Sequence, residues 1–335
     1  MTMRDTNERR PVTPGDATLD DFQSDDPAMQ RCLELARVAA RTDLPILILG
    51  ETGTGKSLLA RAIHNSSPRA GRPFIAFNSA ALSDTLLDSQ LFGHEKGAFT
   101  GAQRQVKGKF EAAHDGTLFI DEIANMTPAA QAKILRAVEH GEFERLGSET
   151  LRTADVRVIA ATHWPLREFL DRDRFRRDLF YRISGLTLTV PPLRERPNDL
   201  RSLIAAEIAR ANRQQGKAIT GLDRAAMDRL MAHPWPGNLR ELNRVIRAAV
   251  ALTEGQTIPP EAVLIETTDG HPSCPEPARG SADAVDPSAD GADLTLRAAE
   301  LRHIRRVLEM MGGNRRRAAR ALGVSRSTLD RKLSS

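Results

Sequence analysis

Two short segments carry residues whose types and spacing could bind and hydrolyse a nucleoside triphosphate. The first is a glycine-rich run at 50–57, which follows an apolar strand-like segment and precedes a helical pattern. In such a P-loop, backbone N–H groups wrap phosphate at a helix N-terminus, the lysine reaches the β and γ phosphates, and the serine holds Mg²⁺. A glycine-rich turn without a ligand is the alternative. The residues predicted to contact ATP here are Gly50, Glu51, Thr52, Gly53, Thr54, Gly55, Lys56 and Ser57.

The second segment is an apolar run at 117–120 that ends in Asp121 and Glu122. Two carboxylates at the end of a buried strand are costly unless a cation or a proton relay uses them. We expect Asp121 to bind Mg²⁺ through water, together with Ser57. We expect Glu122 to orient and deprotonate the attacking water. ATP and Mg²⁺ are therefore the predicted cofactors.

Near-continuous apolar runs must position these segments. They lie at 45–49, 74–77, 117–120 and 156–161, with helical patterns between them. Strands buried on both faces and joined by helices predict a parallel sheet flanked by helices, an α/β fold. We place this ATPase subdomain at 23–197. A periodic helical pattern at 198–266 predicts an α-helical lid.

The remaining chain divides by composition. Residues 1–22 are polar and are expected to form a disordered leader. Residues 267–293 carry six acidic residues against one arginine and predict a flexible linker. Residues 294–335 carry eleven Lys and Arg against three acidic residues, a charge that suits DNA phosphates. No apolar run could span a membrane and no secretory signal is present, while two distant cysteines fit a reducing cytoplasm.

The basic segment 294–335 has the spacing of an all-α helix-turn-helix domain. Gly312-Gly313 ends a first helix that is expected to pair in a dimer, Asn314 caps a second, and the turn at 323–325 leads to a third, which would enter the major groove. A basic amphipathic tail for an acidic protein partner is the alternative. The candidate DNA contacts are Arg326, Ser327, Thr328, Arg331 and Lys332.

A further run lies between the two halves of the ATP site and has no role in nucleotide chemistry. Two glycines bracket Phe99 and Thr100, and the flanking residues 93–96 are not expected to bury an aromatic ring. A loop with an apolar tip suits a surface that grips a partner and moves. An ordinary hairpin turn with its phenylalanine in the core is the alternative. The run consists of Gly97, Ala98, Phe99, Thr100, Gly101 and Ala102.

The stretch Leu91–Ala102, downstream of the P-loop, resembles the AAA+ activators of sigma-54 RNA polymerase, the bacterial enhancer-binding proteins. Residues 312–329 resemble the Fis-type domain that ends these activators. The resemblance covers 23–335 apart from the linker. It implies a cytoplasmic activator that binds double-stranded enhancer DNA and assembles as a hexamer. ATP hydrolysis would move the loop at 97–102 against sigma-54 and convert the closed promoter complex of the holoenzyme into an open one.

The same resemblance implies roles for single residues. Asn78 matches the residue that holds the catalytic glutamate in check until the partner is engaged. Thr162, with His163 beside it, matches the sensor-I position. Arg240 matches the sensor-II arginine, which reaches the phosphates. Arg176 and Arg182 match the arginine fingers that enter the ATP site of a neighbouring subunit, where they stabilise transition-state charge.

A sensory domain would need on the order of 100 residues, and only about 22 precede the ATPase core. We therefore expect control by a separate regulatory protein, by a sister activator in a mixed ring, or by expression level. Two other functions stay open. One is a DNA-binding AAA+ regulator that works with ordinary polymerase, and the other is an ATP-driven remodeller such as a helicase loader.

Overall fold

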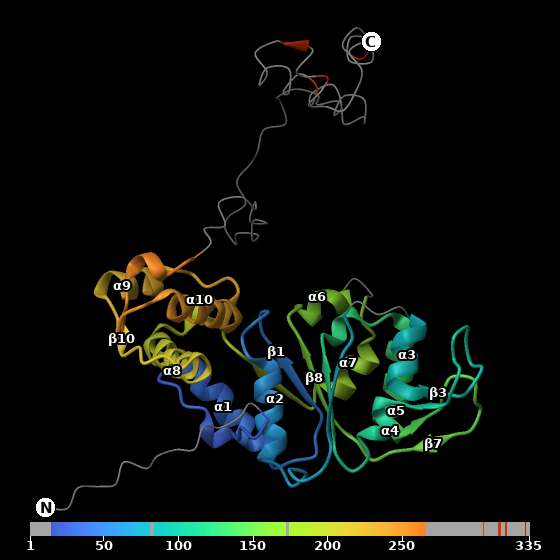
Figure 1. The fold of residues 1–335 in the computed structure, drawn as a ribbon. Coiled ribbons are helices and arrows are strands. Elements are labelled where there is room, and N and C mark those ends of the chain that lie inside the picture. The colour runs from blue at the N-terminus through green and yellow to red at the C-terminus, as the bar shows by residue number, and fades with distance from the viewer. Residues whose placement is uncertain are drawn as a thin grey trace, which may run out of the picture. The chain divides into compact units, whose positions relative to one another are not determined.

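The computed structural model describes residues 15–80, 84–171 and 174–265, together with the single residues 304, 314, 315, 319 and 332. The chain divides into two compact units, residues 1–267 and 268–335. All helices and strands with assigned bounds belong to the first unit (Figure 1). In the described parts of the chain, no helix is both long and apolar enough to cross a membrane.

A five-stranded sheet forms the centre of the first unit. Every neighbouring pair in it is parallel, which confirms the predicted α/β class. In spatial order the strands are β2 (Phe74–Asn78), β5 (Thr117–Asp121), β8 (Arg157–Thr162), β1 (Ile46–Leu49) and β9 (Leu186–Thr189). Four of these strands match predicted runs. The fifth, β9, was missed because Leu-Thr-Leu-Thr is not a continuous apolar run.

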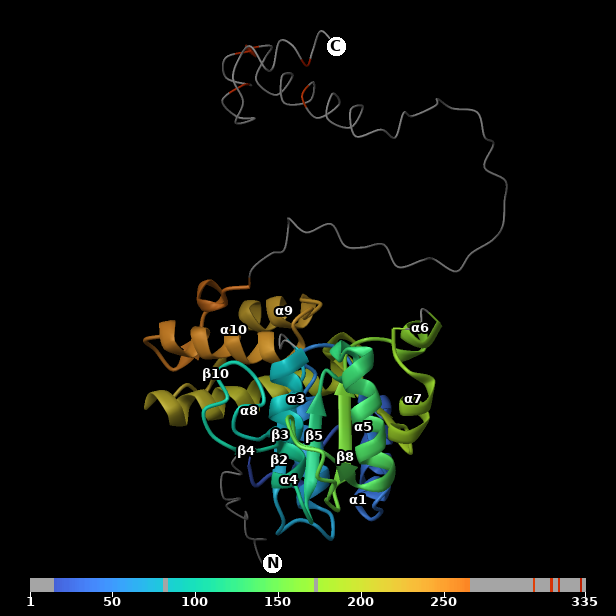
Figure 2. The ribbon, with the colours of Figure 1, turned by 90° about the vertical axis from the view of Figure 1, so that its right-hand side faces the viewer.

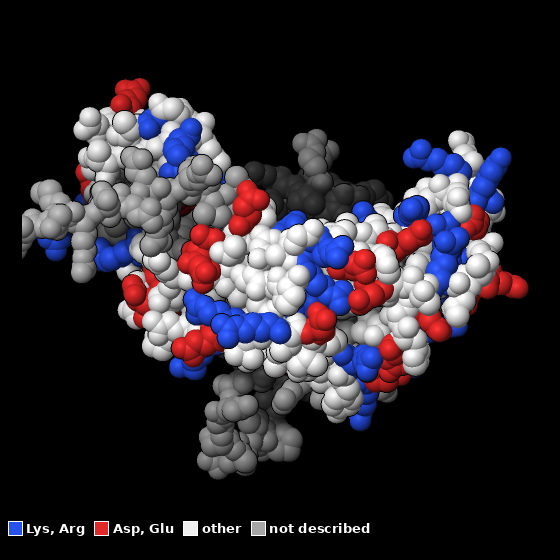
Figure 3. All heavy atoms as spheres, turned by 90° about the horizontal axis from the view of Figure 1, so that it is seen from below, with Lys and Arg blue, Asp and Glu red and all other residues white. Residues whose placement is uncertain are grey.

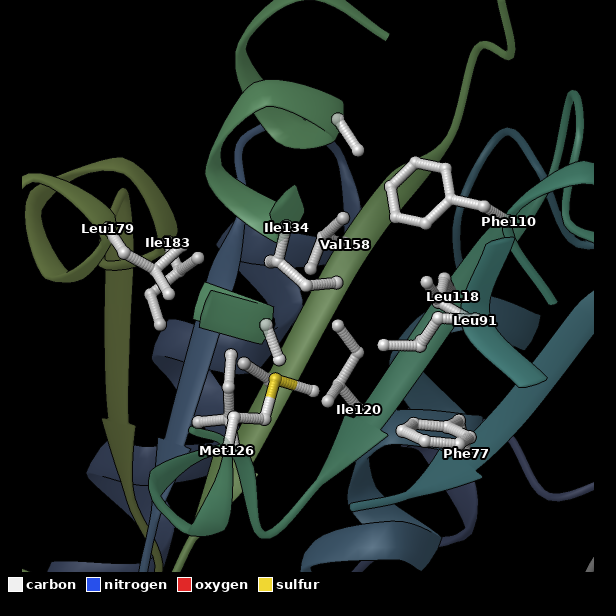
Figure 4. Close-up of a cluster of buried hydrophobic side chains, with 14 of the residues drawn as sticks. Phe77, Leu91, Phe110, Leu118, Ile120, Met126, Ile134, Val158, Leu179 and Ile183 are labelled. Carbon is white, nitrogen blue, oxygen red and sulfur yellow. The ribbon is translucent and has the colours of Figure 1, made fainter. Parts of the chain in front are cut away.

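Helices cover both faces of this sheet. On one face α1 (Pro27–Ala40) and α2 (Lys56–Asn65) share an apolar cluster with β1, β8 and β9. On the other face lie α3 (Asp84–Phe92), α4 (Lys109–Ala112), α5 (Pro128–His140) and α7 (Arg177–Ile183). Figure 2 shows α3 and α5 beside β5 and β8. Figure 4 shows the cluster between them, in which Phe110, Ile120 and Ile134 are almost fully buried.

Local sequence signals explain where these helices begin and end. Asp26 caps α1 by accepting a hydrogen bond from the Ala28 amide at 2.9 Å, and Pro27 occupies the first helical position. Thr127 and Pro128 open α5 in the same way. The helix α6 (Leu166–Asp171) follows β8. Four short strands extend outward: β3 (Gly93–His94) pairs with β4 (Val106–Lys107), and β6 (Glu142–Phe143) pairs with β7 (Arg152–Thr153).

The lid contains the expected helices α8 (Pro197–Gln215), α9 (Arg224–Ala232) and α10 (Asn238–Leu252). They enclose their own apolar cluster, in which the buried Trp235 indole donates a hydrogen bond to the Leu230 carbonyl at 3.0 Å. The sequence pattern predicted a wholly helical lid, but the lid also contains a short pair of strands. Two residues of β10 (Gly221–Leu222) pair in parallel with β11 (Thr257–Ile258), in connections too short to give a strand pattern.

Residues 15–22, which belong to the expected disordered leader, are ordered and pack on the fold. Residues 15–22 contain a short 3₁₀ turn (Leu19–Asp21) and pack on α2. The Leu19 side chain is buried and its amide donates to the Ser66 hydroxyl at 2.9 Å, while the Asn65 amide donates to the Ala17 carbonyl at 2.8 Å. Predicted disorder up to residue 22 is therefore wrong for residues 15–22, and residues 1–14 lie outside the described chain.

Candidate nucleotide-binding and partner-contact sites

The P-loop joins β1 to α2, and the side chain of Lys56 folds back onto the backbone carbonyls at the start of the loop. Gly55 is the N-cap of α2, with a left-handed φ of 99°. The Lys56 ammonium donates hydrogen bonds to the Gly50 carbonyl at 2.8 Å and the Glu51 carbonyl at 3.1 Å. Burial lowers the pKa of Lys56, and the carboxylates of Glu122 and Asp121 oppose that effect. The fold therefore brings a cation, a helix N-terminus and two carboxylates together, and their roles in binding and hydrolysing ATP stay predictions.

Residues of the lid and of the turn just before it bind the P-loop, and the sequence did not indicate these contacts. Asn238, the first residue of α10, donates to the Glu51 carboxylate at 3.2 Å and to the Thr52 carbonyl at 3.1 Å. The Arg194 guanidinium forms two hydrogen bonds with Glu51, at 2.6 and 2.9 Å. These partners are 143 to 187 residues apart in the chain, so no local pattern could reveal them.

Gly53 shows how closely the P-loop approaches the lid. Its φ is +84°, and a β-carbon added there would lie 2.3 Å from the Gly237 carbonyl oxygen of the lid. Arg240 is nearby, because the same β-carbon would lie 3.2 Å from the Arg240 Cβ. The positive charge of Arg240 also contributes to lowering the pKa of Lys56. The geometry thus places Arg240 beside the P-loop, where the resemblance expects it.

Asp121 and Ser57 meet at the carboxyl end of β5. Ser57 and Asp121 line the same hollow, and burial followed by repulsion from Glu122 raises the pKa of Asp121, against the smaller lowering effects of Lys56 and Ser57. Hard oxygen ligands of this kind suit Mg²⁺, which keeps several waters and phosphate oxygens in its shell. Over the described residues no group of three His, Cys, Asp or Glu could hold a metal alone. By their chemistry, a hydroxyl and a carboxylate oxygen fit a cation that also binds nucleotide phosphates.

Glu122 is held from the end of β8. Its Oε2 accepts hydrogen bonds from His163 Nδ1 at 2.7 Å, the His163 amide at 3.3 Å and the fully buried Thr162 hydroxyl at 3.4 Å. Asn78 ends β2 on the other side of β5, and its Oδ1 accepts from the Ala80 amide at 2.8 Å. In the described part of the chain no hydrogen bond links Asn78 to Glu122, and the checking role of Asn78 stays a prediction.

A cavity of about 340 Å³ opens beside Thr54 and Gly55 of the P-loop. This volume and its largely apolar lining suit the nucleoside part of a nucleotide. Its walls come from the residues before α1, from α1, from α2 and from the lid, and include Ala17, Phe22, Met29, Leu59, Leu203 and Leu239. Sequence reasoning missed this pocket because its lining residues carry no motif and come from distant segments.

The predicted arginine fingers contact their own chain in this structure. The Arg176 guanidinium forms a two-bond ion pair with Asp178, at 3.0 and 2.7 Å. Arg182 donates to the Glu139 carbonyl at 3.1 Å. Both are on or next to α7, together with Tyr181, which is 74% exposed. A role in a neighbouring subunit stays a prediction.

The loop at 97–102 is carried between β3 and β4. Its backbone closes on itself, because the Gly97 amide donates to the Ala102 carbonyl at 2.8 Å. Thr100 is exposed, but Phe99 is half-buried, with its ring centroid 5.0 Å from that of His94 in an edge-on contact. The expectation that residues 93–96 could not bury an aromatic is therefore wrong for His94, which is itself buried by the β3–β4 pairing.

The base of this loop is fastened to residues 142–153, which we name the arm and which contains β6 and β7. The buried Arg145 forms ion pairs with Glu95 at 3.0 Å and Glu111 at 2.7 Å. Gly147 has a φ of +75°, and a β-carbon there would lie 2.8 Å from the Ala98 Cβ. The arm therefore fixes the start of the loop while Thr100 at its tip stays accessible.

The predicted DNA contacts lie largely beyond the described chain. Arg326, Ser327, Thr328 and Arg331 are outside it, and Lys332 is a half-buried residue in helical conformation. On the face drawn in Figure 3, acidic and basic side chains are interspersed.

Comparison with known proteins places three families along the chain. A sigma-54 interaction domain matches residues 22–189, an AAA+ ATPase lid domain matches residues 194–279, and a bacterial regulatory protein domain of the Fis family matches residues 295–334. The first of these contains both the P-loop and the loop at 97–102. The lid and Fis matches follow the order of the predicted segments.

Similar whole proteins are transcriptional regulators. The transcriptional regulatory protein ZraR of Klebsiella oxytoca is 42% identical over 97% of this chain and 71% of its own length. The Nif-specific regulatory protein of Azotobacter vinelandii is 43% identical over 89% of this chain, which spans just over half (55%) of that protein. The crystal structure of NtrX from Brucella abortus with ADP aligns with a TM-score of 0.67 and 33% identity, over 94% of this chain and 68% of NtrX.

Proposed function

The chain belongs to the family of sigma-54-dependent transcription activators, and from that membership we propose that it uses ATP hydrolysis to remodel the sigma-54 RNA polymerase holoenzyme. It has the AAA+ ATPase fold with a lid and a Fis-type DNA-binding domain. The observation that carries the proposal is the sigma-54 interaction domain match at 22–189, which spans two separately built sites. One site gathers Lys56, Asp121 and Glu122, and the other presents Thr100.

In the proposed chemistry Lys56 binds the β and γ phosphates, and Arg240 approaches them from the lid. Glu122 accepts a proton from the attacking water. Ser57 and Asp121 would hold Mg²⁺, which neutralises phosphate charge when bound. The apolar cavity beside Gly55 would receive the nucleoside.

The mechanical output depends on assembly. We propose a hexameric ring in which Arg176 and Arg182 act in the ATP site of a neighbouring copy, stabilising transition-state charge. The exposure of Tyr181 and Arg176 on this surface supports contact with another copy. The segment 294–335 would bind enhancer DNA, pairing as a dimer, and the arm would transmit movement to the loop at 97–102. A regulatory protein or a sister activator is the proposed source of control, in the cytoplasm.

The direct test is promoter opening by the purified chain. We expect a sigma-54 promoter to open with ATP and sigma-54 holoenzyme, and to stay closed with a non-hydrolysable ATP analogue. A promoter read by ordinary polymerase should not respond. Activation of that second promoter instead would favour the regulator that works with ordinary polymerase. A DNA footprint without a preferred site would favour the general remodeller.

A further inference from the structure

The segment that leads into α1 joins the ATPase subdomain to the lid beside the nucleotide cavity. Residues 15–26, which we name the strap, are hydrogen-bonded at one end to the C-terminal end of α2. At the other end, the carboxylate of Asp199 in α8 accepts the Ser24 hydroxyl at 2.7 Å and the Asp25 amide at 2.8 Å. We propose that Asp199 is a positioning residue for nucleotide binding, because it fastens the strap to the lid as one wall of the nucleoside pocket. This inference rests on the proposed role of that cavity in receiving the nucleoside.

The Asp199 carboxylate is buried and surrounded by donors. Its side chain is 2% exposed, and a buried carboxylate is costly unless polar or charged groups bind it. The Arg196 guanidinium pairs with Oδ2 through Nε at 2.9 Å and Nη2 at 2.8 Å, on the oxygen that also accepts Ser24. Burial raises the pKa of Asp199, but the bonds from Ser24, Arg196 and the Asp25 amide together hold it below its usual value. The strap is therefore bound to a charged acceptor, whose hydrogen bonds are about twice as strong as those between neutral groups.

Residues on both sides of this junction line the cavity beside the P-loop. On the strap side the lining includes Gln23, which directly precedes Ser24. On the lid side it includes Arg196, which pairs with Asp199, and Leu203, which lies one helical turn after Asp199. Asp199 thus ties together two walls of the cavity, and it would act on a bound nucleoside through them.

Ser24 is also placed where the strap meets α1. Its hydroxyl accepts the Asp26 amide at 3.1 Å, and its carbonyl accepts the Gln30 side chain at 2.9 Å. Asp26 in turn caps α1, and Met29 and Leu33 of that helix line the same cavity. The bond from Ser24 to the lid carboxylate, between residues 175 positions apart, therefore fixes the strap and the start of α1 against the lid.

This arrangement predicts a particular pattern of ligand affinity. The phosphates are assigned to the P-loop and its Lys56, whereas the strap and α8 line the cavity assigned to the nucleoside. Loosening the strap should weaken the binding of ligands that carry a nucleoside. It should spare inorganic tripolyphosphate, which offers phosphates alone. Damage to the fold as a whole would weaken both kinds of ligand alike.

Isothermal titration with ADP, a non-hydrolysable ATP analogue and inorganic tripolyphosphate, each with Mg²⁺, measures this pattern. Ser24→Ala removes the strap hydroxyl and leaves the pair between Arg196 and Asp199 intact, and Asp199→Asn removes the charge that both partners bind. We expect Kd for both nucleotides to rise about three- to tenfold in Ser24→Ala and more than about tenfold in Asp199→Asn. Tripolyphosphate should stay within about twofold.

The matched control is Ser202→Ala. Ser202 is exposed on the same helix, and its hydroxyl donates to the backbone carbonyl of Asp199 at 2.7 Å, not to the carboxylate. This variant should bind all three ligands as the wild type does.

Two further readouts follow the same contact. In steady-state ATPase assays, Ser24→Ala should raise KM for ATP by about the factor seen in Kd, with kcat within about twofold of wild type. In hydrogen exchange, the Asp25 amide, which donates to Asp199, should be slowed further by ADP in the wild type. In Asp199→Asn it should exchange fast with or without ADP.

Two outcomes overturn the inference. They are an unchanged nucleotide Kd in Ser24→Ala, or a loss of affinity in Ser24→Ala that is equal for the nucleotides and for tripolyphosphate. If Asp199→Asn does not fold, Ser24→Ala decides alone, because the buried Arg196 keeps its partner there. A wild-type chain that binds tripolyphosphate as tightly as the ATP analogue would instead contradict the proposed nucleoside pocket. The two failures are therefore distinguishable within one set of titrations.

Discussion

The P-loop at 50–57 and the loop at 97–102 are both glycine-containing turns, but they are fixed in different ways. The P-loop is held at residues 51–53, by Asn238 of the lid and Arg194 just before it, which both bond Glu51, and by the close approach of Gly53 to Gly237. The loop at 97–102 is fastened at its base, and within it Phe99 lies against His94. At the base, Arg145 pairs with Glu95, and Gly147 contacts Ala98.

This difference corresponds to what each region has to do. Hydrolysis needs its groups held within a fraction of an ångström, and Lys56, Asp121 and Glu122 each form hydrogen bonds with neighbouring groups of the site. A partner-binding loop needs an accessible tip on a support that can move as a unit. Thr100 is exposed, while the buried Arg145 provides that support. Variants in the two regions should therefore separate ATP turnover from promoter opening.

The largest effect is expected in the nucleotide site. Glu122→Gln keeps the shape of the side chain but removes its capacity to accept a proton. We expect kcat for ATP hydrolysis to fall by about 10² to 10⁴, the usual contribution of a general base, while ATP still binds. Steady-state ATPase assays and nucleotide-binding titrations measure the two quantities. Glu149→Gln, an exposed change on the arm, is the control. Equal ATPase rates in the two variants would remove Glu122 from the catalytic site.

A second, smaller effect is expected at the base of the loop. Gly147→Ala places a methyl group 2.8 Å from the Ala98 Cβ, at a φ of +75° that disfavours alanine by about 1–2 kcal/mol. We expect the loop to shift and promoter opening to fall about tenfold, the equivalent of roughly 1.4 kcal/mol, with ATPase within about twofold of wild type. Gly71→Ala is the control, because its β-carbon meets nothing within 4 Å. A parallel loss of ATPase would show that the two regions are not separable.

The sequence predicted the parts of both regions that depend on local pattern. Apolar runs located β1, β2, β5 and β8, and the glycine spacing located the P-loop. The sequence could not predict contacts between segments that lie far apart in the chain. The pairs Glu51–Arg194 and Glu122–His163 join residues 143 and 41 positions apart, and no motif says which side chain each carboxylate contacts. The anchoring of residues 15–22 was missed for the same reason, since Ala17, Leu19 and Phe22 are scattered apolar residues in a polar stretch, and the turn at 19–21 is buried by packing on α2.

A modest effect is expected where the lid meets the P-loop. Arg194 forms a half-exposed ion pair with Glu51 and thereby lowers the pKa of the Glu51 carboxyl. The Arg194→Ala variant removes this pair. Pairs of this exposure contribute up to about 1 kcal/mol, so we expect the Kd for ATP to rise by roughly two- to fivefold. Asn238 still bonds Glu51 and limits the loss. Isothermal titration measures Kd, and an unchanged value would show that the lid does not need this pair to hold the P-loop.

The smallest effect concerns the packing below the nucleotide site. Burial raises the pKa of the Cys32 thiol from 9.0 to about 11, although the nearby Arg196 opposes this. The thiol is therefore neutral in the folded chain at pH 9–11 and ionised in the unfolded chain. The contribution of this group to the free energy of unfolding is fully present below pH 9 and is lost as the pH rises towards 11.

Alkylation at pH 8 tests the burial of the Cys32 thiol, in a Cys274→Ser variant that leaves Cys32 as the one thiol. We expect Cys32 to be alkylated much more slowly in the folded chain than in the unfolded chain, and equal rates would contradict a packed α1.

The separation of the two regions is tested most directly by measuring ATP hydrolysis and promoter opening in one reaction with Thr100→Ala. Thr100 is exposed at the tip of its loop, and Thr150→Ala on the arm is a matched exposed control. We predict that Thr100→Ala hydrolyses ATP at close to the wild-type rate and opens no sigma-54 promoter, while Thr150→Ala does both. Promoter opening by Thr100→Ala at the wild-type yield per ATP hydrolysed would contradict the assignment of this loop as the part that acts on the polymerase.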